Sequence, residues 1–478
     1  MAGAAGVAPA GREGWSSRSA FVLAAVGAAV GLGNIWRFPT LAGENGGGAF
    51  VLFYIACVVL IGLPLILSEI LIGRHGRSDA YDSVMKVAAD SNRSGIWGIF
   101  GGIEILTAFL ILTFYSVVAG WVMYYVGVMG VDFLGALFSG DPFAGALASE
   151  NPEAIAGRMT TLFANNPMLL SMHTLFMAIT IWIVARGVTD GIEKAATYLM
   201  PIFFVLLILI TIYGAFTGEF AKAVSFMFTP DFSKLTPSVM NEALGQALFS
   251  MSLGSAALIT YGAYVSKDTK LAPTSGMIAF ADTGVAILAG LMIFPIVFAV
   301  GLDVAAGPTL VFQSLPLAFH DMPGGSLIGM LFFVLVFFAA LTSSISLLEA
   351  VVAWAKTKFG WSRPKAAWIV GGVIFLVGVA CALSLNVWSD VRLLGFWPLF
   401  ADANIFDTID GFVGKIFLPV AALFLAIFIG WRADKKLVEA ETGLEGGMFA
   451  LWRFLVAWLC PIAVGLILLF GLFPGLLG

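Results

Sequence analysis

Gly27-Ala28-Ala29-Val30-Gly31-Leu32-Gly33-Asn34 stands in the middle of an apolar run that is long enough to cross a membrane. Glycine and asparagine are poor helix formers, and backbone groups freed inside a bilayer must be satisfied by something other than lipid. A later apolar run is interrupted by Ser250-Met251-Ser252-Leu253-Gly254-Ser255. We therefore predict that two membrane helices are broken near mid-depth. The alternative for the first stretch is a helix-packing face built on Gly27-x-x-x-Gly31, which explains neither Asn34 nor the second interruption.

The composition indicates a protein with many membrane helices. Of its 478 residues, 60% are hydrophobic and 11% are charged, whereas soluble domains carry roughly a quarter charged residues. The continuous apolar runs exclude a membrane barrel, in which polar and apolar residues alternate. A membrane helix needs about 20 apolar residues, and the sequence predicts eleven, near residues 20–41, 48–72, 96–128, 168–185, 195–216, 241–265, 278–302, 326–355, 366–386, 412–431 and 451–475.

Other classes of protein find little support. The net charge of -5 is too small to suggest a nucleic-acid partner. The three cysteines all lie in apolar runs, which argues against a disulfide framework. The sequence holds three histidines and neither a Cys-x-x-Cys nor a His-Glu-x-x-His motif, so metal-dependent hydrolysis is unsupported. We expect a protein that is not an enzyme, that lies in the lipid bilayer and that has no obligate protein partner.

The distribution of basic residues predicts the orientation of the chain. If the N-terminus lies in the cytoplasm, most of the 24 lysines and arginines also face the cytoplasm, as membrane proteins prefer. Eleven spans then leave the C-terminus outside, and we expect a bacterial inner-membrane location. Six basic residues remain in the outer half: Arg37, Arg158, Lys222, Lys234, Arg392 and Lys415.

The two predicted breaks fall in the first and the sixth span, which divides the chain into corresponding halves. Because five is an odd number, a second set of five spans lies inverted relative to the first. Matching interruptions in inverted halves indicate the binding site of a transporter. The predicted divisions are a cytoplasmic segment 1–19, a first repeat 20–216, an outer connection 217–240, an inverted repeat 241–431, a cytoplasmic loop 432–450, and a last helix with the C-terminus, 451–478.

Two outer connections are long, at residues 129–167 and 303–325. The apolar stretch Leu310-Val311-Phe312 in the second one could dip toward the membrane as a lid, and a packed surface loop is an equal alternative.

A few polar groups lie inside predicted spans, where they are costly and mark candidate sites. Asp282 has no basic residue nearby in sequence and is a candidate functional residue. The alternative is a buried carboxyl that simply carries a proton. Thr342-Ser343-Ser344 offers consecutive hydroxyls, although hydroxyls often bond their own helix. Arg37 could pair with Asp407 or Asp410 as an outer gate or as a static surface pair. Glu69, Glu104 and Glu349 are interpreted as structural.

A series of motifs runs along residues 12 to about 430. They are Val30 to Pro39 with Glu44 to Phe50, Gly62-Leu63-Pro64 with Glu69 and Gly73-Arg74, Tyr115 with Trp121, Gly245-Gln246 with Phe249 to Gly254, Gly307-Pro308 to Leu315-Pro316, and Leu341 to Ser344. In this order they resemble the neurotransmitter:sodium symporter family and its prokaryotic, eleven-helix branch with the LeuT-type fold, a 5+5 inverted repeat.

The resemblance implies a role for each matching residue. The amides of Leu32 and Gly33 and the hydroxyl of Tyr115 would hold a substrate carboxylate. Na⁺ is the implied cofactor, in two sites: the first with the Ala29 carbonyl, Asn34, Ser250 and Asp282, and the second with Gly27, Val30, Ala339, Thr342 and Ser343. The full set expected at the substrate is Ala28, Ala29, Gly31, Leu32, Gly33, Ile111, Tyr115, Phe249, Ser250, Ser252, Ser255, Ser343 and Leu347. The expected gate residues are Arg37, Asp410, Phe249 and, on the inner side, Arg12.

Several departures from the family pattern carry information. Gly31 stands where monoamine transporters have Asp, which favours amino acids over amines. Asp282 replaces the more usual Asn, and Ala286 lacks a hydroxyl that chloride-dependent relatives use with Tyr54 and Gln246, so we hypothesise that chloride is not required. Thr357 replaces an Asp that faces the N-terminal Arg in relatives, which leaves the partner of Arg12 open.

The sequence thus predicts a sodium-coupled symporter that imports a neutral, hydrophobic or aromatic, amino acid by alternating access. The small Ser255 suggests room for a large apolar side chain. A receptor or channel that binds an amino acid without concentrating it is the alternative, and proton coupling through Asp282 is a lesser variant.

Overall fold

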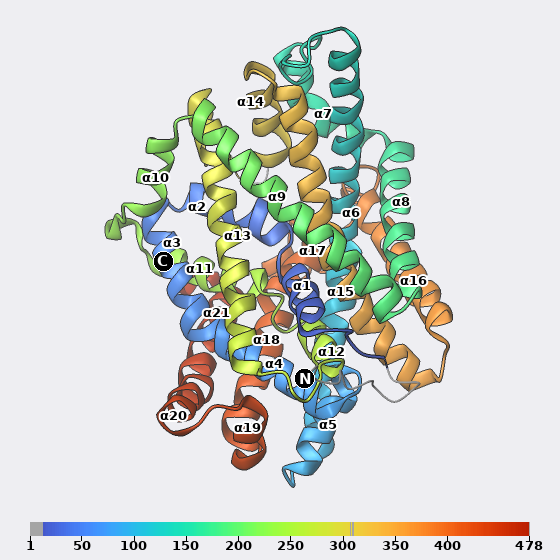
Figure 1. Cartoon of the computed structure of the whole chain (residues 1–478), viewed down its shortest axis with the longest axis vertical. Coiled ribbons are helices and arrows are strands. Elements are labelled where there is room, and N and C mark those ends of the chain that lie inside the picture. Colours follow the sequence, from blue (N-terminus) through green and yellow to red (C-terminus); the bar gives the residue numbers. More distant parts are fainter. Residues whose placement is uncertain (1–12, 306, 308–309, 478) are drawn as a thin grey trace, which may run out of the picture.

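The computed structural model describes residues 13–305, 307 and 310–477, which form helices and their connections with no strand among them. The helices pack as one elongated bundle (Figure 1). Figure 1 places α5 (Ala80–Asp90), α19 (Lys435–Thr442) and α20 (Gly446–Phe454) at one end of the bundle, here called the α5 end. It places α7 (Pro152–Ala164) and α14 (Leu315–Asp321) at the opposite end, here called the α7 end.

The apolar runs form helices long enough to cross a membrane, as predicted. In the described part of the chain nine unbroken helical segments meet the length and hydropathy expected of a span. They are Gly48–Gly76 (α3 and α4), Gly95–Phe138 (with α6), Asn166–Ala185 (α8), Val188–Thr217 (with α9), Leu271–Ala299 (α13), Gly325–Phe359 (α15), Arg363–Leu383 (α16), Ile405–Arg432 (α17 and α18) and Gly446–Leu472 (α20 and α21).

The two remaining runs are broken helices, which confirms the central prediction from the sequence. α1 (Arg18–Ala29) and the following helical segment Gly33–Glu44, which includes α2 (Phe38–Glu44), meet at an angle of 50°. α11 (Pro237–Ser250) and α12 (Ala257–Ala263) are separated by residues 251–256. In the described residues the first bent pair counts as a tenth span, and α11 and α12 occupy the predicted run 241–265.

The connections hold more helix than the sequence predicted. In the expected loop 129–167, α6 (Gly98–Phe138) continues to Phe138 and α7 follows after an N-cap bond from the amide of Ala154 to the side chain of Asn151. α5, α10 (Phe220–Phe228) and α19 are likewise short helices outside the predicted spans. Their moderate hydropathy hides them from a search for membrane spans, whereas caps and an amphipathic face are enough to form a short helix.

The segment 310–321 packs into the bundle. It forms the π-helix Leu310–Ser314 followed by α14, and Leu310, Val311 and Phe312 are buried. The Phe312 ring lies 5.9 Å from the rings of Trp36 and Trp121. The described part of this connection therefore packs against the second half of the first broken helix, at Trp36.

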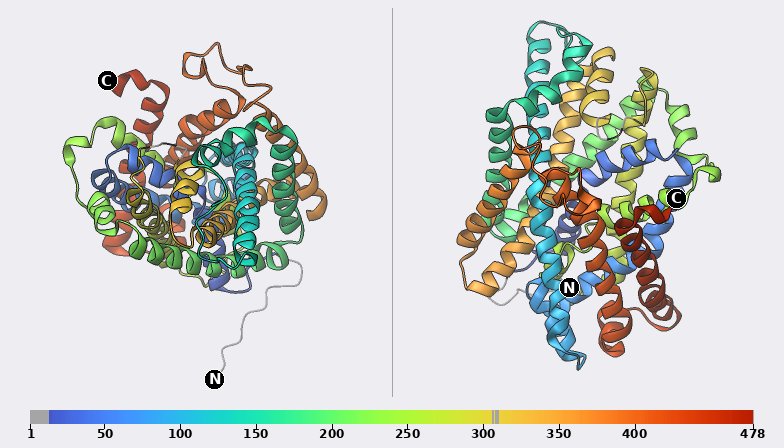
Figure 2. Two further views of the ribbon diagram at one scale, coloured as in Figure 1. Left: turned by 90° about the horizontal axis from the view of Figure 1, so that it is seen from above. Right: turned by 180° about the vertical axis from the view of Figure 1, so that it is seen from behind.

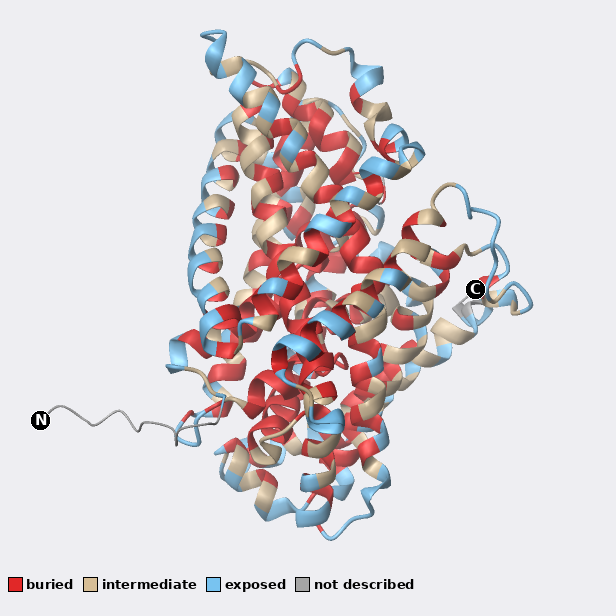
Figure 3. Cartoon of the chain, turned by 90° about the vertical axis from the view of Figure 1, so that its right-hand side faces the viewer, coloured by how far each residue is buried: buried red, intermediate tan, exposed pale blue. Residues whose placement is uncertain are grey.

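Buried residues gather along the middle of the bundle, and exposed ones lie on its outer faces and at its ends (Figure 3). The C-terminal helices, dark red, lie at one edge of the bundle (Figure 2). In the core, α1 packs against α13 and α15, and α12 packs against α4. The two breaks therefore meet inside a shell of long helices.

Candidate functional site

The first break leaves backbone groups of residues 30–33 outside a regular helix. α1 ends at Ala29, and Val30 is extended with φ -70° and ψ 109°. The amide of Gly31 donates to Asn34 Oδ1 at 3.0 Å, and the amide of Leu32 donates to the Tyr115 hydroxyl at 3.1 Å. Side chains from other positions thus satisfy the freed amides, as an apolar environment requires.

Glycine fits at position 31 because any larger side chain there would collide with its neighbours. A Cβ placed on Gly31 would lie 2.6 Å from Ser343 Oγ and 2.9 Å from the Tyr115 hydroxyl oxygen. Both distances are well below van der Waals contact. The absence of a side chain therefore lets α15 and α6 bring two hydroxyls up to the unwound backbone.

The second break is a sharp turn with several left-handed residues. Ser252, Gly254 and Ala256 have φ of 54°, 76° and 58°. Non-glycine residues adopt this conformation only at an energetic cost, so the surroundings must hold it. Ser252 Oγ donates to the carbonyl of Ala28 at 2.9 Å, and the amide of Gly254 donates to Glu69 Oε1 at 2.7 Å. The first bond joins the two breaks to each other.

A buried carboxylate lies beside both breaks. Asp282, on α13, has 0% exposed surface and accepts from Asn34 Nδ2 at 2.7 Å and from Ser250 Oγ at 2.5 Å. The Tyr54 hydroxyl lies 3.2 Å from Ser250 Oγ. No ion pair to Asp282 occurs within the described residues. Because a buried charge without a counter-ion is costly, this group can accept either a cation or a proton.

A second cluster of oxygen atoms lies where α15 meets the end of α1. Ser343 Oγ lies 3.3, 3.4 and 3.1 Å from the carbonyl oxygens of Gly27, Ala28 and Val30. Thr342 Oγ1 lies 3.2 Å from the carbonyl oxygen of Ala339. Backbone carbonyls and hydroxyls are ligands that hard cations prefer. Ser343 thus reaches the carbonyls at the end of α1, whereas the Thr342 hydroxyl bonds the Phe338 and Ala339 carbonyls of its own helix.

Between the breaks lies a small cavity of about 30 Å³. A cavity of this size holds about one or two water molecules. It contains most of the predicted substrate residues and adds Leu418, which the sequence did not single out. Its lining is Ala29, Gly31, Gly33, Ile111, Tyr115, Phe249, Ser250, Ser252, Ser343, Leu347 and Leu418.

The room expected from the small side chain of Ser255 is absent. Ser255 Oγ donates to the carbonyl of Ser252 at 2.6 Å, so this residue stabilises the turn and does not line the cavity. Ala28 does not line the cavity either, since its carbonyl is bonded to Ser252. A substrate larger than water therefore needs side chains to move.

Phe249 separates this cavity from a vestibule of about 280 Å³ that it also lines. The guanidinium carbon of Arg37 lies 4.5 Å from the centre of the Phe249 ring. Arg37 and Asp410 both line the vestibule, but no ion pair between them occurs in the described part of the chain. The predicted gate residues are thus brought together without the salt bridge that the sequence suggested. Asp407, the other acid considered as a partner of Arg37, does not line this vestibule. The Nζ atom of Lys415 lies 6.0 Å from the centre of the Phe400 ring.

At the α5 end, Arg12 falls outside the described residues, and Glu13 makes the ion pairs of the N-terminal segment, which Trp15 and Ser16 also hold through hydrogen bonds to Tyr261 and Glu193. Its carboxylate pairs with Lys356 at 2.8 Å and with Arg363 at 2.6 Å. Arg363 also pairs with Glu349 at 2.6 Å. Burial works to raise the pKa of Glu13, but the bonds to Arg363 and Lys356 outweigh it and lower the pKa to about 2. No motif in the sequence marks this acid, whose charge is opposite to that of Arg12.

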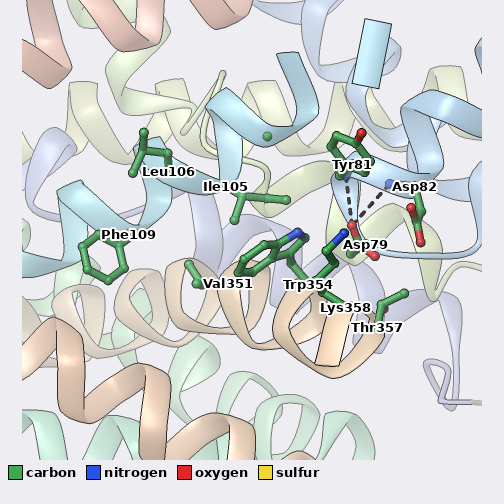
Figure 4. Close-up of a pocket in the computed structure, with 11 residues that line it drawn as sticks. Asp79, Tyr81, Asp82, Ile105, Leu106, Phe109, Val351, Trp354, Thr357 and Lys358 are labelled. Atoms are coloured by element: carbon green, nitrogen blue, oxygen red, sulfur yellow. Dashed lines mark hydrogen bonds between the residues drawn. The ribbon is translucent and has the colours of Figure 1, made fainter. Parts of the chain in front are cut away.

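Thr357, which replaces an expected Asp, bonds its own helix, with Oγ1 donating to the carbonyl of Ala353 at 3.0 Å. It also borders a cavity of about 620 Å³ between α5, α6 and α15. Figure 4 shows this cavity, with Asp79 accepting from the amides of Tyr81 and Asp82. Of the three acids interpreted as structural, Glu69 accepts from an amide in the second break, Glu349 pairs with Arg363 of α16, and Glu104 is fully buried.

Known proteins resemble this chain over nearly its whole length. A model of the sodium:neurotransmitter symporter family matches residues 12–130 and 159–473. A sodium-dependent transporter of Bacillus subtilis, YhdH, is 36% identical over 95% of this chain and 96% of its own. One from Haemophilus influenzae is 35% identical over 97% of this chain and 98% of its own. The crystal structure of MhsT in complex with L-phenylalanine superposes with a TM-score of 0.85, is 41% identical, and matches 96% of this chain and 99% of MhsT.

Proposed function

The chain belongs to the sodium:neurotransmitter symporter family of sodium-dependent membrane transporters and has the LeuT-type fold, and from this premise we propose that it imports a neutral, hydrophobic or aromatic amino acid together with sodium. The single observation that carries this proposal is the hydrogen bond from the Leu32 amide to Tyr115 at the first break. An amide and a hydroxyl that meet in an unwound membrane segment can both donate to a carboxylate.

Recognition of the amino group would use the same segment. Residue 31 is glycine, and a side chain there would collide with Ser343 and Tyr115. No fixed carboxylate therefore faces the cavity from this position to attract the ammonium of an amine that lacks its own acid group. Carbonyls freed by the breaks, such as that of Ala29, would bind the ammonium instead. This supports amino acids over monoamines as substrates.

Two sodium ions would bind beside the substrate. The first would sit among the Ala29 carbonyl, Asn34, Ser250 and Asp282, where the buried carboxylate supplies the negative charge. The second would sit among the carbonyls of Gly27, Val30 and Ala339 and the hydroxyls of Thr342 and Ser343. If the substrate carboxylate completes the first shell, each ligand raises the affinity for the other by the same factor.

The substrate side chain would enter the apolar part of the cavity. Ile111, Phe249, Leu347 and Leu418 line it and carry no charge. MhsT, whose crystal structure contains L-phenylalanine, has 41% identity with this chain. Because the cavity holds only about 30 Å³, a side chain of that size requires Phe249 to swing toward the vestibule. Phe249 would then act as the lid, and Arg37 and Asp410 would approach each other above it.

The N-terminus would lie in the cytoplasm of a bacterial cell and the C-terminus outside, in the inner membrane. The α5 end is then the cytoplasmic end, and the vestibule above Phe249 opens toward the outside. The two five-helix repeats, 20–216 and 241–431, would move relative to each other during alternating access, as inverted repeats do in other carriers.

Thermal unfolding of the purified protein against the twenty amino acids, with and without sodium, tests this proposal. Cys57, Cys381 and Cys460 are buried, so a thiol-reactive dye reports unfolding. Ligands that bind the folded state raise the midpoint. We expect stabilisation by large neutral amino acids in sodium but not in choline. Stabilisation by glycine alone, or equal stabilisation in choline, would overturn the substrate class or the sodium coupling respectively.

A further inference from the structure

A cleft of about 490 Å³ lies at the α5 end, away from the transport site. Four helical segments form it: the end of the tenth span at Phe428–Arg432, α19, α20, and the π-helix Leu455–Leu459. Figure 1 shows α19 and α20 side by side beneath the C-terminal helices. The lining is Gly430, Trp431, Lys435, Glu439, Gly446, Phe449, Ala450, Arg453, Phe454, Ala457 and Trp458.

Two cations face this cleft against one carboxylate. Arg453 and Lys435 line it, and Glu439 is the acid in its wall. Arg453 Nη1 is buried and has no hydrogen-bond partner within the described residues. Asp434 is near, but its carboxylate caps α19 by accepting from the Leu437 amide at 3.0 Å. The Arg453 guanidinium lines the cleft and can donate to a phosphate oxygen there, and rotation of the side chain turns its unused Nη1 toward the cleft.

The rim of the cleft is aromatic and faces outward. Trp431 and Trp458 are 48% and 55% exposed, with ring centroids 5.5 Å apart. Phe454, which also lines the cleft, is 58% exposed. Trp431 lies at the end of the span Ile405–Arg432, and Trp458, farther inside the span Gly446–Leu472, lies beside it. An exposed tryptophan at the end of a span marks the interface between lipid tails and headgroups.

We propose that this cleft binds the phosphodiester headgroup of an anionic phospholipid from the leaflet at the α5 end. Arg453 and Lys435 hold the phosphate, and Trp431, Phe454 and Trp458 contact the glycerol and the start of the acyl chains. A soluble anion would need the two cations but not the exposed aromatic rim, so the rim favours a lipid. In the proposed orientation this leaflet is cytoplasmic. The site does not depend on the identity of the transported substrate.

Native mass spectrometry of the full-length protein tests the site. The protein is mixed with phosphatidylglycerol or with phosphatidylcholine of the same acyl chains, and the retained lipid is counted. The variants are the double substitution Lys435→Gln with Arg453→Gln and the control Lys436→Gln, which removes a neighbouring exposed charge that does not line the cleft. We expect the wild type and the control to retain about tenfold more phosphatidylglycerol than phosphatidylcholine, and the double variant to lose this preference.

The wild type alone decides the question if the double variant does not fold. Equal retention of the two lipids by the wild type would overturn the proposal. Glycerol 3-phosphate is the soluble probe: if it displaces phosphatidylglycerol at equal concentration, the cleft takes a free anion and the lipid assignment is wrong. Failure of glycerol 3-phosphate to compete supports the lipid.

Discussion

The side-chain amide of Asn34 donates to Asp282 Oδ1 at 2.7 Å and to the Asp282 carbonyl at 3.0 Å. This pair joins the second half of the first broken helix to α13, and Ser250, the last residue of α11, donates to the other carboxylate oxygen. One buried carboxylate thus connects both breaks. A change in its charge or its partners will be felt on both sides of the substrate cavity.

Substitution Asp282→Asn should weaken activation by sodium. The buried carboxylate supplies negative charge in a low-dielectric pocket, and its loss leaves a bound cation uncompensated. We expect the sodium concentration for half-maximal substrate binding to rise by about tenfold or more. The fixed charge should also make wild-type uptake equal in chloride and in gluconate.

The control for this experiment is Asp390→Asn, which removes an exposed carboxylate from a loop. Its sodium activation should match that of the wild type. Uptake by the wild type that stops when gluconate replaces chloride would show that Asp282 does not take the place of the anion.

Substitution Tyr115→Phe should weaken substrate binding while the protein still folds. The hydroxyl bonds the Leu32 amide, and a hydrogen bond to a charged carboxylate is typically worth 1.5–3 kcal/mol. We expect binding of the preferred amino acid to weaken by about tenfold or more, measured by isothermal titration calorimetry in sodium. Unchanged affinity would remove the hydroxyl from the carboxylate site.

The double substitution Thr342→Ala with Ser343→Ala should impair sodium dependence far more than stability. Both hydroxyls lie among carbonyl oxygens at the end of α1 and on α15. We expect a higher sodium requirement for substrate binding, by about tenfold. Ser344→Ala is the matched control, because Ser344 Oγ is buried without a hydrogen-bond partner among described residues. Identical sodium activation in the double variant and the control would falsify the second-site assignment.

Substitution Glu13→Gln should release the N-terminal segment from α15 and α16. The pKa of Glu13 is lowered to about 2, so the stabilisation from its ionised form is complete above its ordinary value and is lost as the pH falls toward 2. Between pH 5 and 8 Glu13 stays ionised, so its contribution to the stability of the wild type should not change with pH. We expect trypsin to cleave at the exposed Arg18 roughly two- to fivefold faster in the variant.

Glu445→Gln is the control for trypsin cleavage, since it removes an exposed acid outside this cluster. A rate for Glu13→Gln no higher than that of the control would mean that the Glu13 pairs do not hold the segment.

The sequence predicted the broken helices because their signal is local. Glycines and polar residues inside an apolar run disfavour helix wherever they occur, and Asp282 stands out as the one acid deep in its span. The residues of the two oxygen clusters followed from the family motifs. The short connecting helices were missed because only caps and amphipathic faces mark them.

Other parts of the site depend on packing that no local pattern encodes. Leu418 comes to the cavity from α18, far along the chain. The size of the cavity depends on the rotamer of Phe249 and on the bond that turns Ser255 toward Ser252. Glu13 forms its ion pairs because the packing of α15 and α16 places Lys356 and Arg363 beside it.

Concentrative uptake in sealed proteoliposomes tests the central claim most directly. Purified protein is reconstituted, an inward sodium gradient is imposed, and accumulation of radiolabelled phenylalanine is followed. The account predicts that the internal concentration exceeds the external one and that a sodium ionophore abolishes the excess. Binding of phenylalanine with an internal concentration that never rises above the external one would contradict it.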